Sequence, residues 1–357
     1  MARASLTIDL AAIRANWRAL DAMTECETGA VVKADAYGLG ADQVGPTLLK
    51  VGVRNFFVAL AEEGAALRAA IGPGPRIFVF SGLMPEDVGL VRAAALVPLL
   101  NTPAQLLEAK RVSAKFDAPL TVGFQLDSGM NRLGFEADEL ADALAPSDAL
   151  SGLEVTLVMS HLACADEPDH MMNAAQASAF SAIAAHPVLN STPKSLAATG
   201  GVLLGPAYHF DMTRPGIGLY GGLPFADARP VVTLEAPILQ IRDVAAGEIV
   251  GYGAAYEAAS PRRIATLPVG YADGLARRLS AGFAGRLDGM TLPSAGRVSM
   301  DLVTLDVTGC ATAREGAMVT LLGADQTIDD LADSAGAIGY EVLTSLGSRY
   351  ARRYRDA

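Results

Sequence analysis

The sequence predicts an α/β protein, with an N-terminal (β/α)8 TIM-type barrel followed by a C-terminal, mainly β domain. Between residues 29 and 222, short apolar runs alternate about eight times with Ala-rich helical stretches, which is the rhythm of successive βα units. From residue 229 onward the runs alternate in polarity and are separated by Gly and Pro, which is typical of a small β domain. A doubly wound open sheet has the same local rhythm as a barrel, so the pattern alone admits both.

The expected elements follow one another along the chain. "MARASLTIDLAAIRANW" is typical of a short strand followed by an amphipathic helix. The expected barrel strands are "AVVKA", "NFFVAL", "RIFVFSG", "LVPLLN", "LTVGFQLD", "LEVTLVMSHL", "SLAAT" and "HFDMTRPGIGLYG", with helices such as "AEEGAALRAA" and "PAQLLEAKRV" between them. The second part contains the expected strands "VVTLEAPILQIRDV", "RIATLPVG", "LVTLDV" and "MVTLLG" and the expected helices "TIDDLADSAG" and "GYEVLTSLG".

The length of the chain favours two domains. Its 357 residues exceed the usual size of a single domain. We assign residues 1–226 to the barrel and residues 227–357 to the C-terminal β domain. The strand expected within residues 1–10 is a candidate to pair with the C-terminal domain.

Charge and cysteine content exclude several classes of protein. The net charge of −11, from 28 Lys and Arg against 39 Asp and Glu, argues against a nucleic-acid partner. The cysteines Cys26, Cys164 and Cys310 are far apart and lack CxxC spacing, so we expect neither a disulfide framework nor a metal site. No run reaches the roughly 18 apolar residues that span a bilayer, and the N-terminus lacks a signal-peptide core. We therefore expect a cytoplasmic protein without membrane contact.

Several predicted barrel strands end in polar or charged residues, namely Lys33, Asp127, His161 and Arg214. Barrel active sites lie at the carboxyl ends of the strands, so this placement indicates a site. Lys33 has two interpretations. It is either a surface lysine whose ammonium group extends into solvent, or a partly desolvated amine that forms a Schiff base with a carbonyl cofactor. His161 is equally compatible with a buried structural histidine.

Gly-rich stretches favour the second interpretation of the lysine. In "DMTRPGIGLYGG", Arg214 precedes Gly216 and Ile217, and glycines let backbone N–H groups approach an anion such as phosphate. Tyr252 in "GYGAAYEA" and Tyr271 in "PVGYADGLARR" lie in turns and are candidate acid or base groups. Taken singly, each of these motifs is also explained by an ordinary turn.

Eight motifs follow one another along nearly the whole chain: "AVVKADAYGLG", "LDSGMNRLGF", "SHLA", "DMTRPGIGLYGG", "GYGAAYEA", "LPVGYADGLARRL", "GRVSMDL" and "GYEVLTSLGSRYARRY". In this order they resemble the motifs of bacterial alanine racemase, a family of fold-type III enzymes that depend on pyridoxal 5′-phosphate (PLP). The resemblance implies an enzyme that interconverts L- and D-alanine and supplies D-alanine for peptidoglycan. It also implies a homodimer whose active sites take residues from both subunits.

The resemblance implies roles for individual residues. Lys33 matches the family's Schiff-base lysine, and Tyr252 matches the opposing catalytic tyrosine, which the partner subunit contributes. Arg214 matches the arginine that faces the pyridine nitrogen, and His161 matches the histidine beside the cofactor ring. The phosphate-binding set corresponds to Tyr37, Thr199, Gly216, Ile217 and Tyr340. The residues around the substrate correspond to Arg132, Tyr271 and Met300, the last through its backbone N–H.

Four positions depart from the common pattern of this family. Ser299 stands where Cys is frequent, Ala198 where Asn is frequent, and Ser195 where His is frequent. Gln125 stands where some members carry a carbamylated lysine that orients the substrate-binding arginine. These departures concern the surroundings of the site and leave the residues with direct chemical roles in place.

The implied reaction needs a proton acceptor on each face of the substrate's α-carbon. Lys33 would serve the D-alanine face and Tyr252 the L-alanine face. Because Arg214 is cationic and has no acceptor, it should keep the pyridine nitrogen unprotonated and thereby suppress transamination. Two alternatives remain: a racemase of broader amino-acid specificity, and a non-catalytic PLP-holding protein. The presence of both Lys33 and Tyr252 argues against the second.

Overall fold

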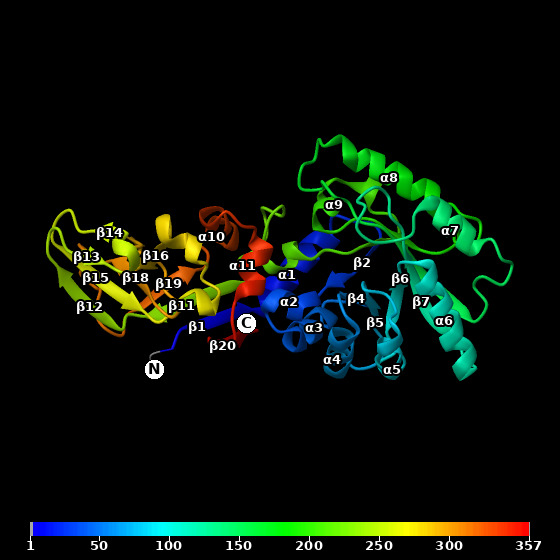
Figure 1. The fold of residues 1–357 in the computed structure, drawn as a ribbon, viewed down its shortest axis with the longest axis horizontal. Coiled ribbons are helices and arrows are strands. Elements are labelled where there is room, and N and C mark those ends of the chain that lie inside the picture. Colours follow the sequence, from blue (N-terminus) through cyan, green and yellow to red (C-terminus); the bar gives the residue numbers. More distant parts are fainter. Residues whose placement is uncertain (1–2, 357) are drawn as a thin grey trace. The chain divides into compact units, whose positions relative to one another are not determined.

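The computed structural model describes residues 3–356, and the chain divides into two compact units (Figure 1). The barrel unit comprises residues 14–36 and 40–219, and the β unit comprises residues 3–13, 37–39 and 220–356. The chain therefore passes between the units four times. The domain boundary predicted after residue 226 stays a prediction.

Within the described residues, seven parallel strands lie side by side in chain order from β3 to β9. Phe56 and Phe57, neighbours in β4, are both 0% exposed. Successive side chains of a strand point to opposite faces, so both faces of the sheet are covered here, as is usual for parallel sheets. The bounds are β3 (Ala30–Val31), β4 (Asn55–Val58), β5 (Arg76–Val79), β6 (Val97–Leu100), β7 (Leu120–Gln125), β8 (Leu153–Met159) and β9 (Lys194–Ser195).

An eighth strand, β10 (Met212–Thr213), closes the sheet between β9 and β3. On the side of β3, Val31 N donates to Pro215 O at 3.0 Å. On the side of β9, Arg214 N donates to Ala197 O at 2.8 Å. The prediction of a (β/α)8 barrel is therefore confirmed, and the doubly wound open sheet is wrong.

Helices alternate with the barrel strands along the chain, as βα units require (Figure 1). The helices expected in "AEEGAALRAA" and "PAQLLEAKRV" are confirmed as α4 and α6. Helix α6 begins with Pro103 because Thr102 Oγ1 accepts a hydrogen bond from Gln105 N and caps this end. The bounds are α1 (Leu10–Asp21), α2 (Lys33–Gly38), α3 (Ala41–Leu49), α4 (Ala61–Ile71), α5 (Val88–Ala93), α6 (Pro103–Phe116), α7 (Ala137–Leu144), α8 (Met171–Ala184) and α9 (Thr199–Leu203); the short elements are β2 (Glu27–Thr28), η1 (Pro85–Asp87), η2 (Pro206–Tyr208) and η3 (Ile217–Tyr220).

Sheets dominate the β unit. Within the described residues, it holds a six-stranded sheet in the order β17-β16-β19-β11-β1-β20, the three-stranded sheet β12-β15-β18 and the pair β13-β14. The two helices expected near the end of the chain are confirmed as α10 (Ile328–Ala335) and α11 (Gly339–Ser345). The remaining bounds are β11 (Val232–Pro237), β12 (Gln240–Val244), β13 (Ile249–Val250), η4 (Tyr252–Ala254), β14 (Tyr256–Glu257), β15 (Arg262–Leu267), η5 (Tyr271–Asp273), η6 (Arg277–Ala281), β16 (Ala284–Leu287), β17 (Met290–Pro293), β18 (Val303–Asp306) and β19 (Met318–Leu322).

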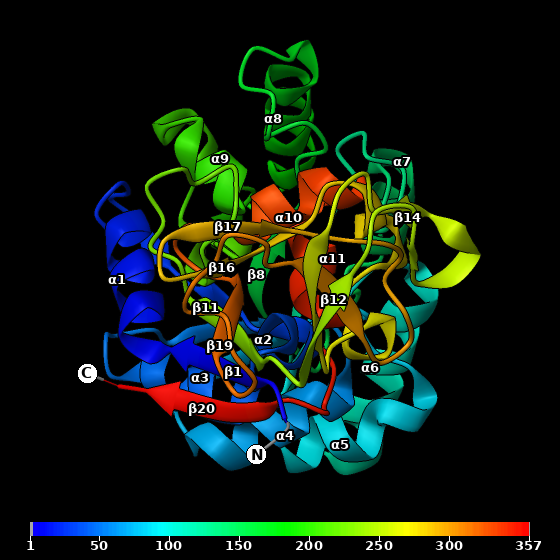
Figure 2. The same cartoon turned by 90° about the vertical axis from the view of Figure 1, so that its left-hand side faces the viewer.

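The first strand of the chain lies inside the sheet of the β unit. Strand β1 (Ser5–Asp9) pairs antiparallel with β11 and parallel with β20 (Ala351–Arg355). Figure 2 shows β20, in red, alongside β1, in blue. The two ends of the described chain thus contribute adjacent strands to one sheet.

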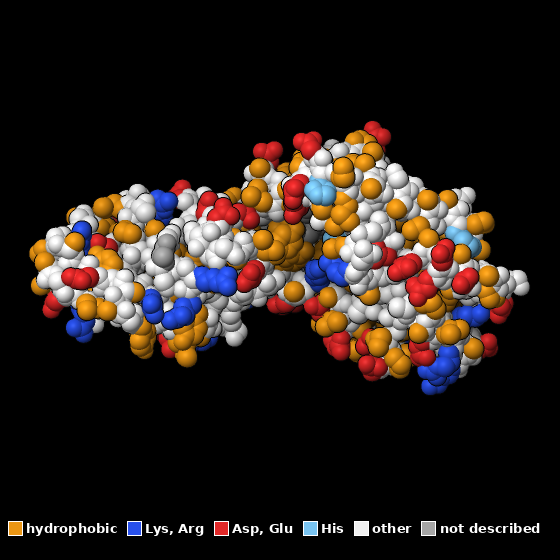
Figure 3. Space-filling view, turned by 45° about the horizontal axis from the view of Figure 1, so that its top comes forward, with side chains coloured by type: hydrophobic (Ala, Val, Ile, Leu, Met, Phe, Trp, Pro, Cys, Tyr) orange, Lys and Arg blue, Asp and Glu red, His pale blue; other side chains and the backbone are white. Residues whose placement is uncertain are grey.

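Charged and apolar side chains are interspersed on the face shown in Figure 3. Large apolar side chains at the surface of the β unit include Ile249, Tyr252 and Met300, which are 57%, 71% and 54% exposed. None of the helices in the described residues is both long enough and apolar enough to cross a membrane. Between residues 3 and 356, no group of three or more His, Cys, Asp or Glu side chains is placed to hold a metal ion.

Candidate active site

Lys33 is followed by a turn of the opposite hand to an ordinary helix. It lies two residues after the end of β3 and begins α2 (Lys33–Gly38), but the four residues from Ala34 to Tyr37 have φ values between 51° and 57°. We call this segment the left-handed turn (Ala34–Tyr37). Such a conformation costs L-residues roughly 1–2 kcal/mol each, so surrounding contacts must hold it.

Two carboxylates hold the left-handed turn within the barrel unit. Glu63, in the first turn of α4, accepts hydrogen bonds from Ala34 N at 2.8 Å and from Ala59 N at 2.7 Å. Asp35 accepts a hydrogen bond from Ala41 N at 2.7 Å through its side chain. Glu63 thus ties the residue after Lys33 to the loop that follows β4. Sequence reasoning missed Glu63, because a glutamate three residues into a helix is typical of a cap.

Replacing Glu63 with Gln should destabilise this arrangement. The amide offers one oxygen where the carboxylate offers two, so Ala34 N or Ala59 N loses its acceptor. We expect the free energy of unfolding to fall by about 1–3 kcal/mol, measured by denaturant or thermal unfolding. Glu62→Gln is the matched control, because Glu62 is exposed in the same helical turn. Equal stabilities of the two variants would contradict this assignment.

The Lys33 side chain lies among groups that favour its neutral form. Burial lowers the pKa of Lys33, Arg132 lowers it further, and the Glu63 carboxylate opposes them. The Lys33 Nζ also lies 5.7 Å from the centre of the Phe80 ring. A partly desolvated amine of lowered pKa can act as a nucleophile or a base near neutral pH.

Arg214 follows β10 and is buried, with 1% exposure. Its Nη1 donates to Ser195 Oγ at 2.5 Å, and its Nη2 donates to Ser160 O at 2.7 Å and to Leu196 O at 3.4 Å. Ser195 Oγ in turn donates to Met212 O at 2.5 Å. Burial lowers the pKa of Arg214 to about 9, so the guanidinium remains cationic at neutral pH and is fixed by oxygen acceptors.

His161 lies after β8, among three cations. Its pKa is lowered to about 3, first by burial and then by Arg214, Arg132 and Lys33. The ring is therefore neutral at physiological pH, with one N–H donor and one acceptor nitrogen. Arg214, Arg132 and Lys33 thus all act on His161. Lys33, His161 and Arg214 are residues that the sequence predicts at strand ends, and Arg132 joins them from the loop after β7.

Arg132 lies in the loop after β7, and neighbouring side chains hold this loop through its backbone. Asp127 Oδ1 accepts a hydrogen bond from Asn131 N at 3.2 Å, and Gln125 Nε2 donates to Leu133 O at 3.1 Å. Asp127 Oδ1 also accepts a hydrogen bond from Gly129 N at 2.7 Å, so this carboxylate holds the loop at two backbone positions. Gln125 holds the same loop one residue beyond Arg132, at Leu133.

A turn of backbone N–H groups lies beside Arg214. Thr199 Oγ1, at the start of α9, accepts hydrogen bonds from Gly216 N at 3.0 Å and Gly218 N at 3.3 Å. Ile217 lies between them and is 1% exposed. The predicted residues Thr199, Gly216 and Ile217 are thus together in the barrel unit.

Tyr37 and Tyr340, the other members of the predicted phosphate set, lie together in the β unit. The ring centre of Tyr37 is 4.6 Å from that of Tyr220 and 5.9 Å from that of Tyr340. Burial raises the pKa of Tyr37, so its hydroxyl keeps its proton. Gly38 follows at φ 81°, and a Cβ there would lie 2.7 Å from Leu343 O, so only glycine fits.

Tyr252, Tyr271 and Met300 line one cavity of about 450 Å³ in the β unit. Arg277 and Arg297 line it as well, and a Cβ at Gly253 would lie 2.9 Å from Arg297 Nη1. A guanidinium therefore lies against the turn that carries Tyr252. The three residues that the sequence predicts for catalysis and substrate binding in this unit are brought together.

Comparisons with known proteins identify the family. Sequence models of the N-terminal and C-terminal domains of alanine racemase match residues 8–224 and 231–354. The chain is 55% identical over 359 residues to the alanine racemase of Cereibacter sphaeroides, with 99% of each chain covered. It is 46% identical over 357 residues to the catabolic alanine racemase of Agrobacterium fabrum, with 98% of this chain and 91% of that one covered.

A solved structure agrees with this result. The crystal structure of alanine racemase from Bartonella henselae, with covalently bound pyridoxal phosphate, superimposes with a TM-score of 0.94 at 35% identity. The match covers 99% of this chain and 100% of that one. The chain, over both its barrel and its β unit, therefore belongs to the alanine racemase family.

Proposed function

We propose that the protein interconverts L- and D-alanine with pyridoxal phosphate as its cofactor, and that Lys33 and Tyr252 act as proton acceptors on opposite faces of the substrate. The observation that carries the proposal is the group of Lys33, His161 and Arg214 after the carboxyl ends of barrel strands, together with Arg132 from the loop after β7. Membership of the family supports the substrate and the cofactor.

The residues of the barrel unit fit this cofactor by their chemistry. Lys33 offers an amine whose pKa is lowered, which suits an aldehyde. Arg214 offers only N–H donors, which suit an unprotonated ring nitrogen. The Thr199 hydroxyl accepts hydrogen bonds from Gly216 N and Gly218 N on either side of Ile217, and its own proton is a donor suited to a phosphate group. In this proposal Tyr37 and Tyr340 supply further phosphate contacts.

When bound, pyridoxal phosphate makes the Cα–H of an amino acid acidic by delocalising the electron pair left behind. Lys33 then takes or returns the Cα proton on the face that belongs to D-alanine. Tyr252 does the same on the face of L-alanine. The lowered pKa of Lys33 places more of this amine in the neutral form that accepts a proton.

Arg214 directs the outcome of the proton transfer. Its guanidinium has no acceptor and is held by oxygen atoms of Ser195, Ser160 and Leu196. It therefore disfavours a proton on the ring nitrogen, which limits electron withdrawal and favours return of the proton to Cα. A neutral His161 has one donor and one acceptor nitrogen, which suits a link between the Tyr252 hydroxyl and Arg214.

We propose roles in substrate binding for Arg132, Tyr271 and Met300. In this proposal Arg132 and the backbone N–H of Met300 bind the carboxylate, and Tyr271 borders the substrate. Within the described residues the Met300 N–H donates to no acceptor, although its neighbour Ser299 N donates to Leu302 O at 2.9 Å. An unengaged donor beside a cavity of about 450 Å³ supports a ligand contact here.

We propose that the active form is a homodimer in which Tyr252 of one copy serves Lys33 of the other. Tyr252 is 71% exposed in the single chain, whereas an acid–base tyrosine works best in a site from which water is excluded. Ile249, Tyr271 and Met300 are also more than 40% exposed, at 57%, 42% and 54%. Burial of these side chains by a second copy would desolvate the cavity that Tyr252, Tyr271 and Met300 line.

The cellular role is part of the same proposal. We propose that the enzyme acts in the cytoplasm and supplies D-alanine for peptidoglycan. The three free cysteines support a reducing compartment. A catabolic role is the alternative, because the relative from Agrobacterium fabrum carries that description.

Assays of Ala, Ser, Lys and Arg in deuterated water test the proposed function. We expect deuterium at Cα of both L- and D-alanine, with far lower rates for the other three amino acids. Comparable rates for Ser, Lys or Arg would indicate the broad-specificity racemase. Absence of exchange with all four, in protein loaded with cofactor, would indicate the non-catalytic PLP-holding protein.

A further inference from the structure

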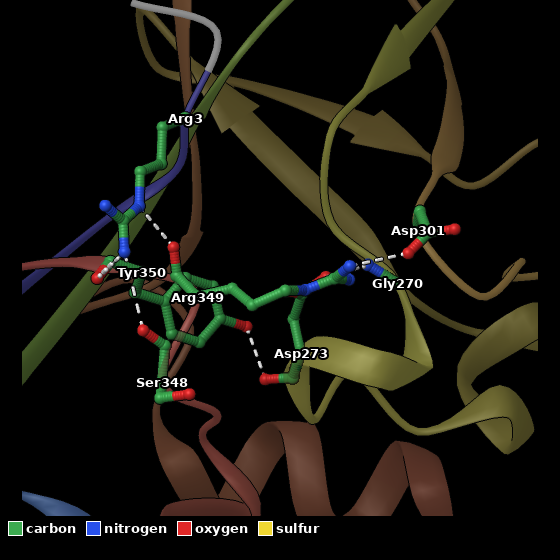
Figure 4. A network of polar contacts seen from close by, with 7 residues as sticks. All are labelled: Arg3, Gly270, Asp273, Asp301, Ser348, Arg349 and Tyr350. Atoms are coloured by element: carbon green, nitrogen blue, oxygen red, sulfur yellow. Dashed lines mark hydrogen bonds and ion pairs between the residues drawn. The ribbon is translucent and has the colours of Figure 1, made fainter.

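Arg349 joins two separate acidic residues of the β unit (Figure 4). It lies between α11 and β20. Its Nε and Nη2 donate to Asp273 Oδ1 and Oδ2, each at 2.7 Å, and its Nη1 donates to Asp301 Oδ1 at 2.7 Å. One guanidinium thus makes a bidentate pair and a third charge-assisted hydrogen bond, which are among the strongest polar contacts in proteins.

The two carboxylates belong to segments that border the cavity of the β unit. Asp273 is two residues after Tyr271, and Asp301 directly follows Met300. Asp273 is 3% exposed, and its Oδ2 also accepts a hydrogen bond from Gly270 N at 2.9 Å. Arg349 therefore connects the segment that carries Tyr271 with the segment that carries the Met300 N–H.

Backbone contacts leave these segments little freedom. Tyr271 N donates to Ser299 O at 3.0 Å, and Ala272 N donates to Met300 O at 2.9 Å. A Cβ at Gly270 would lie 2.3 Å from Ser299 O and 2.4 Å from Met300 O, so only glycine allows this approach. The carbonyl of Met300 is thereby fixed. Within the described residues its N–H donates to no acceptor, so it remains available to a ligand.

Hydrogen bonds hold the backbone on either side of Arg349. Arg3 donates to the carbonyl oxygens of Arg349 and Tyr350, the latter at 3.0 Å (Figure 4). Tyr350 Oη and Gly347 N both donate to Asp273 O, at 2.8 Å and 3.0 Å. The chain on either side of Arg349 is thus bound to the same segment that its guanidinium holds.

We propose that Arg349 is a positioning residue that sets the direction of the Met300 N–H relative to Tyr271 and so controls binding of the substrate carboxylate. This inference rests on the proposed function. Binding geometry of this kind must be held within about 0.5 Å, and small displacements of a binding group weaken its contact with a ligand. The hydrogen bond from Arg349 to Asp301 acts on the segment of Met300, and the two hydrogen bonds to Asp273 act on the segment of Tyr271.

A purely structural role makes a different prediction. The Asp273 carboxylate is buried, so loss of its cation should lower stability. Asp301 is 56% exposed and Arg349 is 49% exposed, and exposed ion pairs add little stability. The pair of Arg349 with Asp301 therefore distinguishes the two roles. Its loss should weaken substrate binding and should change the unfolding temperature little.

The test compares four variants as holoenzymes: Asp301→Asn, Arg349→Lys, Arg349→Gln and Arg355→Gln. Arg355 is the matched control, because it pairs with Asp9 elsewhere in the same unit. The measurements are KM and kcat for alanine in both directions, the inhibition constant of propionate, and the unfolding temperature. Propionate carries the carboxylate without the amine, so its binding reports carboxylate recognition separately from the chemistry.

For Asp301→Asn we expect KM for alanine and the inhibition constant of propionate to rise about tenfold, with little change in kcat or unfolding temperature. Arg349→Lys retains the charge and should remain folded, yet it cannot span both carboxylates and should show the same rise. Arg349→Gln should also lose stability, whereas Arg355→Gln should leave KM unchanged. A normal KM and a normal propionate constant in Asp301→Asn and Arg349→Lys would overturn the inference. Absence of racemisation in the unaltered enzyme would instead contradict the proposed function.

Discussion

Replacing Lys33 with Ala is expected to abolish racemisation in both directions, with kcat reduced by at least about 10³-fold. Lys33 is the amine in the coupled group at the barrel mouth, and both burial and Arg132 lower its pKa. In the proposed function, its removal takes away the nucleophile for the cofactor and the proton acceptor on one face of the substrate. A reaction that needs acceptors on both faces then stops in both directions.

Absorbance and activity together test this result. The absorbance band of the bound cofactor, at about 420 nm, should disappear in Lys33→Ala. The far-ultraviolet circular dichroism, which reports the secondary structure, should stay unchanged. Lys115→Ala is the matched control, since Lys115 is exposed at the end of α6. A Lys33→Ala enzyme that kept both the band and its activity would show that another amine holds the cofactor.

Replacing Tyr252 with Phe is expected to separate the two directions of proton exchange. The change removes one hydroxyl from a side chain that is 71% exposed, so stability should change by no more than about 0.5 kcal/mol. Exchange of the Cα proton of L-alanine with solvent should fall about 10²- to 10⁴-fold. Exchange from D-alanine should continue, because the proposal assigns that face to Lys33.

Deuterium incorporation, followed by nuclear magnetic resonance for each enantiomer, measures the two exchange rates separately. Tyr256→Phe is the matched control, because it removes a hydroxyl four residues away in β14. If Tyr252→Phe left exchange from L-alanine at its normal rate, the scheme with two acceptors would be wrong. Equal losses from both enantiomers would also contradict it.

The residues at strand ends were predictable because of the geometry of parallel strands. Lys33, His161 and Arg214 follow β3, β8 and β10, and the carboxyl ends of parallel strands meet at one end of a barrel. Their coupling in the structure follows from that rule. The roles of Tyr252 and Met300 could be inferred only from the motif order, since each alone is an exposed residue in a turn.

The contacts that hold these residues were not predictable from the local pattern. The left-handed turn (Ala34–Tyr37) contains no glycine, so nothing in its sequence marks the positive φ values. The hydrogen bond between Glu63 and Ala34 joins residues 29 positions apart in the sequence, and the one between Arg349 and Asp273 joins residues 76 positions apart. Hydrogen bonds at such separations depend on tertiary structure, which composition and periodicity do not specify.

Two of the four positions that depart from the family pattern, Ser195 and Gln125, have clear structural explanations. Ser195 accepts a hydrogen bond from Arg214 and donates to Met212 O, so the small hydroxyl serves as both acceptor and donor. Gln125 holds Leu133 O in the loop of Arg132. Both side chains keep hydrogen bonds near the site, and neither the Ser hydroxyl nor the Gln amide titrates near neutral pH.

The place of β1 in the sheet of the β unit has a consequence for the order of folding. Synthesis produces β1 (Ser5–Asp9) before the barrel strands, β11 (Val232–Pro237) after them, and β20 (Ala351–Arg355) last of these three partners. At about 5–20 residues per second, β1 is therefore made well before either strand that it pairs with. The barrel strands pair with one another and need no strand of the six-stranded sheet, whereas that sheet cannot be complete until β20 has been made.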